Sequence, residues 1–168
     1  MLEIIKYDEN KHVTRWDSFV WQSNNGTIFH TREFLTYHKD RKFQDCSFIF
    51  QNKNNIEALF TGAIIDNVLY SHPGASFGGF VYNELSFESG SKIVDLLVNF
   101  AQQNNLKEII IIPTPFIYYN QYNEVMEYCL YIKGCNIIEY YISSFVDLEI
   151  NLLEQMHNRK KRYIKKME

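Results

Sequence analysis

Apolar residues recur along the chain with two periods, one typical of helices and the other typical of strands. Ile93, Leu97 and Ala101 return every four positions, which predicts a long amphipathic helix. Ser86 or Glu84 stands where this helix is expected to begin, and Asn104–Asn105 where it ends. The same helical period predicts further helices over residues 11–23, 31–38 and 117–130, and another from residue 149 onward.

Runs of β-branched and aromatic residues predict the strands. They cover residues 2–7, 46–51, 56–65, 68–70, 80–82, 107–112 and 136–148. Asn52–Asn55 suits a tight turn, so the strands on either side of it should form an antiparallel hairpin. The four isoleucines at 109–112 favour a strand covered on both faces. The order β-α-α-β-β-β-α-β-α-β, with a trailing helix, predicts an α/β (α+β) fold with a mixed sheet and helices on both faces.

Composition narrows the class of protein. A chain of 168 residues, 46% apolar and 22% charged, is long enough for one well-buried core and has ordinary globular composition. It contains no run of eighteen apolar residues, so no membrane span is expected. Three cysteines without metal-ligand spacing favour neither a disulfide framework nor a zinc site, and a cytoplasmic location is expected.

Four segments carry a resemblance to a known family, and it runs across nearly the whole chain. They read WDSFV at 16–20, SNNGTIFH at 23–30, FLTYHKDR at 34–41 and SHPGASFGG at 71–79. These segments, in this order of elements, resemble the N-terminal half of FemAB-like acyltransferases, which belong to the GNAT N-acetyltransferase superfamily. The resemblance implies a GNAT-like fold and transfer of an acyl or aminoacyl group to an amine. Acetyl-CoA or an aminoacyl-tRNA would be the donor, and a sugar or bacterial cell-envelope precursor the acceptor.

The sequence departs from the GNAT pattern at the donor site. A CoA-binding GNAT domain carries a Q/R-x-x-G-x-G/A loop whose backbone N–H groups hold the pyrophosphate. Residues 77–92 read FGGFVYNELSFESGSK at this junction, with Glu84 and Glu88 where they would repel an anion. The resembling proteins also continue into a second domain. We therefore expect an incomplete enzyme, with its donor site on a second GNAT-like domain or a homodimer partner.

The C-terminal segment is basic, although the chain carries a net charge of −3. We divide the sequence into a GNAT-like domain over 1–150 and a basic helix over 151–168. The basic helix fits contacts with phosphates of a nucleic acid or membrane, an approach to an acyl-carrying tRNA, or a lead-in to the missing second domain. The acidic remainder disfavours general nucleic-acid binding, and the lead-in is the preferred interpretation.

The Gly-rich segment 71–79 supplies the candidate catalytic residues, His72 and Ser71. In a GNAT fold this region adjoins the acyl carrier, and a histidine there can act as a base on the attacking amine. The alternative is that His72 only hydrogen-bonds a Gly-Pro turn. The candidate substrate-binding residues are Gly74, Phe77, Gly78 and Gly79 from this segment, and Tyr37, His38 and Arg41 from the short helix that covers the acceptor site in GNAT domains.

Other polar and aromatic residues leave alternatives open. His30 and His38 lie eight positions apart with no carboxylate or cysteine at ligand spacing, so no metal is expected. Tyr118, Tyr119 and Tyr122 fit either packing or the stacking of a sugar ring. The rival to an enzyme is a non-catalytic domain derived from the GNAT fold that binds a ligand or assembles with a partner.

Overall fold

A computed structural model describes residues 1–37, 44–71, 73–142, 144–145 and 156–164. It divides the chain into two units, Met1–Asn136 and Ile137–Glu168. In the second unit the described helix is α6, Asn158–Ile164. The predicted boundary between residues 150 and 151 lies outside the described residues and stays a prediction.

The first unit is built on a mixed β-structure in two four-stranded sheets. The strands are β1 (Leu2–Lys6), β2 (Gln44–Asp45), β3 (Phe48–Asn52), β4 (Asn55–Thr61), β5 (Ala63–Ile65), β6 (Val68–Tyr70), β7 (Gly79–Tyr82) and β8 (Glu108–Ile110). One sheet has the order β1-β3-β4-β7 and is antiparallel throughout. The other has the order β2-β5-β6-β8, in which β6 and β8 are parallel. Only Gly62 separates β4 from β5, so one run of chain serves both sheets.

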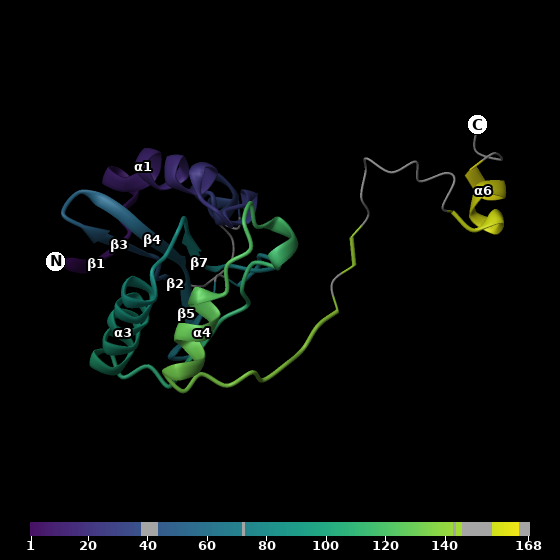
Figure 1. Cartoon of the computed structure of the whole chain (residues 1–168). Coiled ribbons are helices and arrows are strands. Elements are labelled where there is room, and N and C mark those ends of the chain that lie inside the picture. Colours follow the sequence, from purple (N-terminus) through teal and green to yellow (C-terminus); the bar gives the residue numbers. More distant parts are fainter. Residues whose placement is uncertain (38–43, 72, 143, 146–155, 165–168) are drawn as a thin grey trace. The chain divides into compact units, whose positions relative to one another are not determined.

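Helices cover both faces of the antiparallel sheet (Figure 1). They are α1 (Glu9–Gln22), α2 (Arg32–Thr36), α3 (Phe87–Gln103) and α4 (Val125–Ile132), with short 3-10 turns η1 (Ile28–His30) and η2 (Phe116–Tyr118). Alternation along the strands decides which face each side chain joins. Ile49 and Val81 pack with Trp16 of α1. Phe50 and Phe80 pack in the core that α3 and α4 cover.

Local signals in the sequence predict several elements correctly. Ser86 is the N-cap of α3, where its side chain accepts a hydrogen bond from the Ser89 N–H, and Asn104 is the C-cap. The β3–β4 hairpin pairs Asn52 with Asn55, and Lys53 in its turn has φ 58°. The predicted α/β (α+β) fold with a mixed sheet and helices on both faces is therefore confirmed.

The strand predicted over residues 56–65 is divided at Gly62 into β4 and β5, and three further predicted elements also differ from the structure. α4 begins at Val125 rather than residue 117, because the amides of residues 120–121 bond to Asn24 and the Asn123 side chain accepts from the Val125 N–H. Residues 136–142 and 144–145 form no strand, because no described strand pairs with them. The isoleucines after residue 108 are not covered on both faces, because Ile109 and Ile110 are only partly buried and Ile112 is 48% exposed.

Candidate functional site

Residues 71–79 connect β6 to β7 and so pass from one sheet to the other. Ser71 is 6% exposed, and its N–H donates to the Ile110 carbonyl at 2.9 Å. Its hydroxyl accepts from the Ile112 N–H at 2.9 Å, and the Gly78 N–H donates to the Ile112 carbonyl at 2.9 Å. Ser71 therefore fastens this segment to the chain that follows β8. His72, the candidate base, lies outside the described residues.

The two glycines at the start of β7 allow a close approach between strands. A Cβ on Gly78 would lie 2.7 Å from the Thr61 Oγ1 atom and 2.9 Å from the Ser71 carbonyl oxygen. Gly79 has φ +86°, and its N–H donates to Thr61 Oγ1 at 2.8 Å. Tight packing of the backbone thus explains why glycine is needed at both positions. The predicted contact of Gly78 and Gly79 with a substrate stays a prediction.

We expect Gly79→Ala to lower the free energy of unfolding by about 2–3 kcal/mol, measured by urea denaturation. Alanine is strained at positive φ, and its Cβ would also lie 2.9 Å from Cγ2 of Ile111. Gly134→Ala is the matched control, since Gly134 has φ +85° and nothing within 4 Å of the added Cβ. The control should cost only about 1–2 kcal/mol. Equal losses in the two variants would show that the contact with Ile111 is unimportant.

An aromatic row runs beside residues 71–79. The ring centroids are 4.9 Å apart for Phe34 and Phe29, 4.9 Å for Phe29 and Phe77, and 5.4 Å for Phe77 and Tyr118. Phe77 is 5% exposed and therefore packs in the interior, whereas Tyr118 is 53% exposed. The structure brings together three short segments here: α2 with η1, the 71–79 segment and η2. Tyr118 is the exposed end of this aromatic row.

The other predicted contact residues lie at the end of α2, within the 71–79 segment, or outside the described residues. Tyr37 is the C-cap of α2 and is 81% exposed. Gly74 has φ +103° within the 71–79 segment. His38 and Arg41 lie outside the described residues, so their predicted contact with an acceptor remains untested.

His30 is a buried structural residue at the base of this site. Its Nδ1 accepts from the Thr27 N–H at 3.1 Å, which leaves Nε2 to carry the proton and face Thr114 Oγ1 at 3.3 Å. Burial lowers the pKa of His30 to about 4, so the ring is neutral near pH 7. The sequence did not indicate this role, although the Thr27 cap three positions earlier is a local signal for it.

Asn24 and Asn25 lie between β7 and residues 120–121. The Asn25 side chain donates to the Phe80 carbonyl and accepts from the Tyr82 N–H, both at 2.9 Å. The Asn24 N–H donates to the Tyr82 carbonyl at 2.8 Å, and the Asn24 carbonyl accepts from the Asn120 N–H at 2.8 Å. From the sequence these asparagines predict only a helix end. In the structure they also bond to the backbone groups on the edge of β7 that faces away from β4.

A chain of hydrogen bonds leads from this edge toward α4. The hydroxyls of Tyr82 and Tyr119 are 3.4 Å apart, and the Tyr119 hydroxyl donates to the Glu127 carboxylate at 3.1 Å. Burial raises the pKa of all three groups. At neutral pH both tyrosines are therefore protonated and hold this end of β7 against α4.

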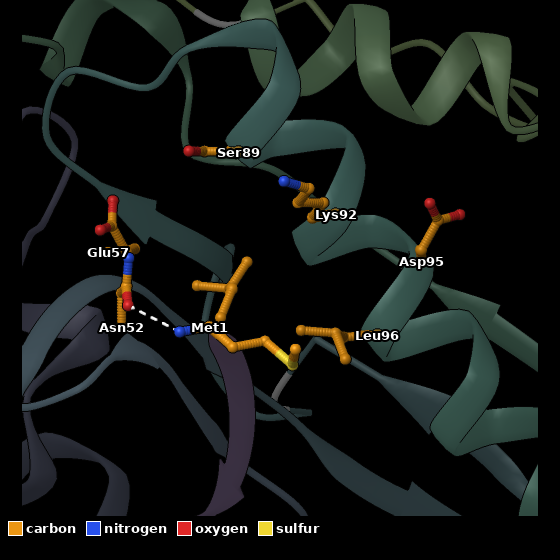
Figure 2. Close-up of a pocket in the computed structure, with 8 residues that line it drawn as sticks. Met1, Asn52, Glu57, Ser89, Lys92, Asp95 and Leu96 are labelled. Atoms are coloured by element: carbon orange, nitrogen blue, oxygen red, sulfur yellow. Dashed lines mark hydrogen bonds between the residues drawn. The ribbon is translucent and has the colours of Figure 1, made fainter.

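Two shallow clefts lie outside this region. The first has a volume of about 360 Å³, and its lining includes Lys92 and Asp95 of α3 with Asn52 and Glu57. Figure 2 shows these residues, and the Met1 amine donates to Asn52 Oδ1 at 3.1 Å. The lining of this cleft carries both positive and negative side chains, and some of its polar groups already bond to one another. The cleft therefore favours no single class of ligand.

The second cleft, of about 390 Å³, is acidic at its rim and has Arg32 at its base. Arg32 is 5% exposed and pairs with Asp45, while its guanidinium carbon lies 3.6 Å from the centre of the Tyr7 ring. Its Nε is buried and has no hydrogen-bond partner among the residues that the structure describes. Sequence reasoning missed Arg32, because an arginine in a short helix normally faces solvent.

Known proteins resemble this chain in structure only. No family model matches the chain, and no curated protein matches it. Two solved structures of the aminoglycoside acetyltransferase meta-AAC0020, from an uncultured soil metagenomic sample, are similar to it at 15% identity, covering 88% of this chain and 96% of that one. The complex with trehalose gives a TM-score of 0.47 and the complex with sisomicin 0.48. The fold description therefore rests on the strands and helices given above.

The described residues add two observations on metals and membranes. Among them, no group of three or more His, Cys, Asp or Glu residues could hold a metal ion. No helix in the described part of the chain is long and apolar enough to cross a membrane.

Proposed function

We propose that this chain is a GNAT-like N-acyltransferase domain that holds the amine acceptor beside residues 71–79. The observation that carries the proposal is the separation of two neighbouring stretches of chain at this point. The Gly78 N–H still bonds to Ile112, but from Phe80 onward the partners of β7 on that side are Asn24 and Asn25. We place a small acceptor beside the Gly-rich segment, at the point where these two stretches diverge.

The chemistry needs few groups. Transfer of an acyl group to an amine requires an oriented amine and the removal of one proton. His72 is proposed as the base, and the aromatic row that ends at Tyr118 as the wall against which the acceptor lies. An amine carried on a sugar ring suits that wall, because a ring's apolar face can rest on an aromatic side chain.

The donor is proposed to bind outside this first unit. Asn24 and Asn25 already fill the edge of β7, and Glu88 in the first turn of α3 would repel a pyrophosphate there. An acyl-CoA would then be supplied on a second domain or a second subunit. This division of labour explains why the sequence lacks a phosphate-binding loop.

The proposal is tested by ligand binding to the whole chain. We expect glucosamine and related amino sugars to shift the ¹⁵N-amide resonances of Phe77, Gly78 and Gly79, whereas 1 mM acetyl-CoA should leave the melting temperature unchanged. Tyr118→Ala, at the exposed end of the aromatic row, should weaken acceptor binding by about tenfold, and Tyr163→Ala, at another exposed tyrosine, should not. Amino sugars that perturb none of these amides would refute the acceptor site. Stabilisation by acetyl-CoA would refute the external donor site.

A further inference from the structure

Carboxylates from two helices line the cleft that has Arg32 at its base. Glu9 and Asp17 come from α1 and Glu33 from α2, around a volume of about 390 Å³. Asp17 Oδ1 accepts from the Arg32 N–H at 2.7 Å, which joins the two helices at this point. No ion pair within the described part of the chain involves any of the three carboxylates. The rim of the cleft therefore favours a ligand with positive charge.

Arg32 does not neutralise this rim, because its own charge is already paired. One terminal nitrogen of the guanidinium donates to the Asp45 carboxylate, and the other donates to Ser47 Oγ at 3.2 Å. That leaves Nε, a buried donor for which the described residues supply no acceptor. A donor in this state is costly, so a ligand that brings an acceptor to the base of the cleft gains a bond that water does not provide. The cleft thus suits a ligand that carries both positive charge and a hydrogen-bond acceptor.

The spacing of the carboxylates indicates how the positive charges of the ligand are arranged. Glu9 and Asp17 are separated by about 12 Å along the axis of α1, so one ammonium group cannot contact both. In an extended peptide, side chains four positions apart lie on the same side, at about 13 Å from each other. Basic residues at this spacing can reach both carboxylates, while the main chain between them presents carbonyl oxygens to Arg32 Nε. A polyamine matches the charges equally well but has no acceptor.

We propose that the cleft between α1 and α2 is a docking site for an extended basic peptide, with Lys or Arg side chains about four positions apart. The basic side chains of the peptide pair with the carboxylates of Glu9, Asp17 and Glu33, and one of its carbonyl groups accepts from Arg32 Nε. This inference goes beyond the proposed function, because the cleft contains none of residues 71–79 and its ligand is not the acyl acceptor.

The test measures peptide binding to the whole chain through the ¹⁵N–¹H resonances of the Asp17 amide and of Arg32 Nε. The probe is acetyl-Lys-Ala-Ala-Ala-Lys-amide, and its neutral counterpart has glutamine in place of both lysines. We expect the basic peptide to bind at least about tenfold more tightly than the neutral peptide and to shift both resonances. Spermidine should shift the Asp17 amide but leave the Arg32 Nε resonance in place, because it offers no acceptor.

Two double variants separate the cleft from the overall charge of the protein. Glu9→Gln with Glu33→Gln changes two exposed residues of the rim and should weaken binding of the basic peptide by about tenfold. Glu84→Gln with Glu108→Gln is the matched control, because it changes the net charge equally at exposed residues that do not line the cleft. Its affinity should stay within about twofold of the wild type.

Three results would overturn the proposal. They are a basic peptide that binds no more tightly than the neutral one, equal weakening in the two double variants, and binding that leaves the Arg32 Nε resonance unmoved. An Nε shift caused by spermidine would also contradict it, since the shift would not then report an acceptor. None of these measurements uses an amino sugar or an acyl donor, so the proposed function is judged separately.

Discussion

Replacing Asp45 with alanine should destabilise the protein by about 3 kcal/mol, measured by urea unfolding at pH 7. Asp45 is the counter-ion of Arg32, whose side chain is only 6% exposed, against 38% for Asp45 itself. Removing the carboxylate would leave a buried guanidinium without a neutralising partner, which costs more than the loss of the contact alone. Because solvent reaches Asp45, the expected loss lies at the lower end for a buried pair.

Two further variants separate charge from geometry at this pair. In the wild type, Asp45 Oδ1 accepts a hydrogen bond from the Ser47 N–H at 3.0 Å. Asp45→Asn keeps an oxygen for this bond but removes the negative charge. It should therefore lose nearly as much stability as Asp45→Ala. The double variant Arg32→Met with Asp45→Ala removes both charges and should be more stable than Asp45→Ala alone. A loss below about 1 kcal/mol in Asp45→Ala would contradict this account, because it would mean that the pair behaves like an exposed ion pair.

Acidification should destabilise the protein through His30. Its pKa is about 4 in the folded protein and 6.5 without burial, so the unfolded chain binds the proton more readily between these values. Stability is therefore full above pH 6.5 and falls as the pH is lowered toward 4. A difference of about 2.5 units corresponds to a loss of about 3 kcal/mol from this one residue.

The measurement compares unfolding free energies at pH 7.5 and pH 4.5 for the wild type and His30→Gln. Glutamine cannot titrate, so the variant should be less stable at pH 7.5 yet lose clearly less stability on acidification. The carboxylates of the protein titrate in both proteins, and their contribution cancels in the comparison. Identical pH profiles for the two proteins would contradict a neutral, buried His30.

The parts of the fold that could be predicted carry local signals. The turn at Asn52–Asn55 and the caps Ser86 and Asn104 act within a few residues of their own position, so pattern and propensity suffice to find them. The strand over 136–148 had a clear pattern as well, but a strand forms only against a partner. None of the strands that the structure describes pairs with the described residues of this segment.

The candidate site was only partly predictable for the same reason. The Gly-rich segment 71–79 was recognisable because Gly78 and Gly79 meet a steric demand that no other residue satisfies as well. Asn25 and Arg32 act on groups 55 and 13 positions away in the sequence, Phe80 and Asp45. Side-chain partners at such separations depend on how the sheets are assembled, and neither residue type signals its partner.

Because two continuous stretches of chain each contribute a strand to both sheets, the two sheets should unfold cooperatively. β4 enters the second sheet as β5 after Gly62, and β2 leads into β3 through Cys46 and Ser47. Neither sheet can come apart while the other keeps its register, because a slip in one run shifts pairings in both. Local opening that separates the two sheets is thereby suppressed, and the first unit should exchange its central amide protons only through global unfolding.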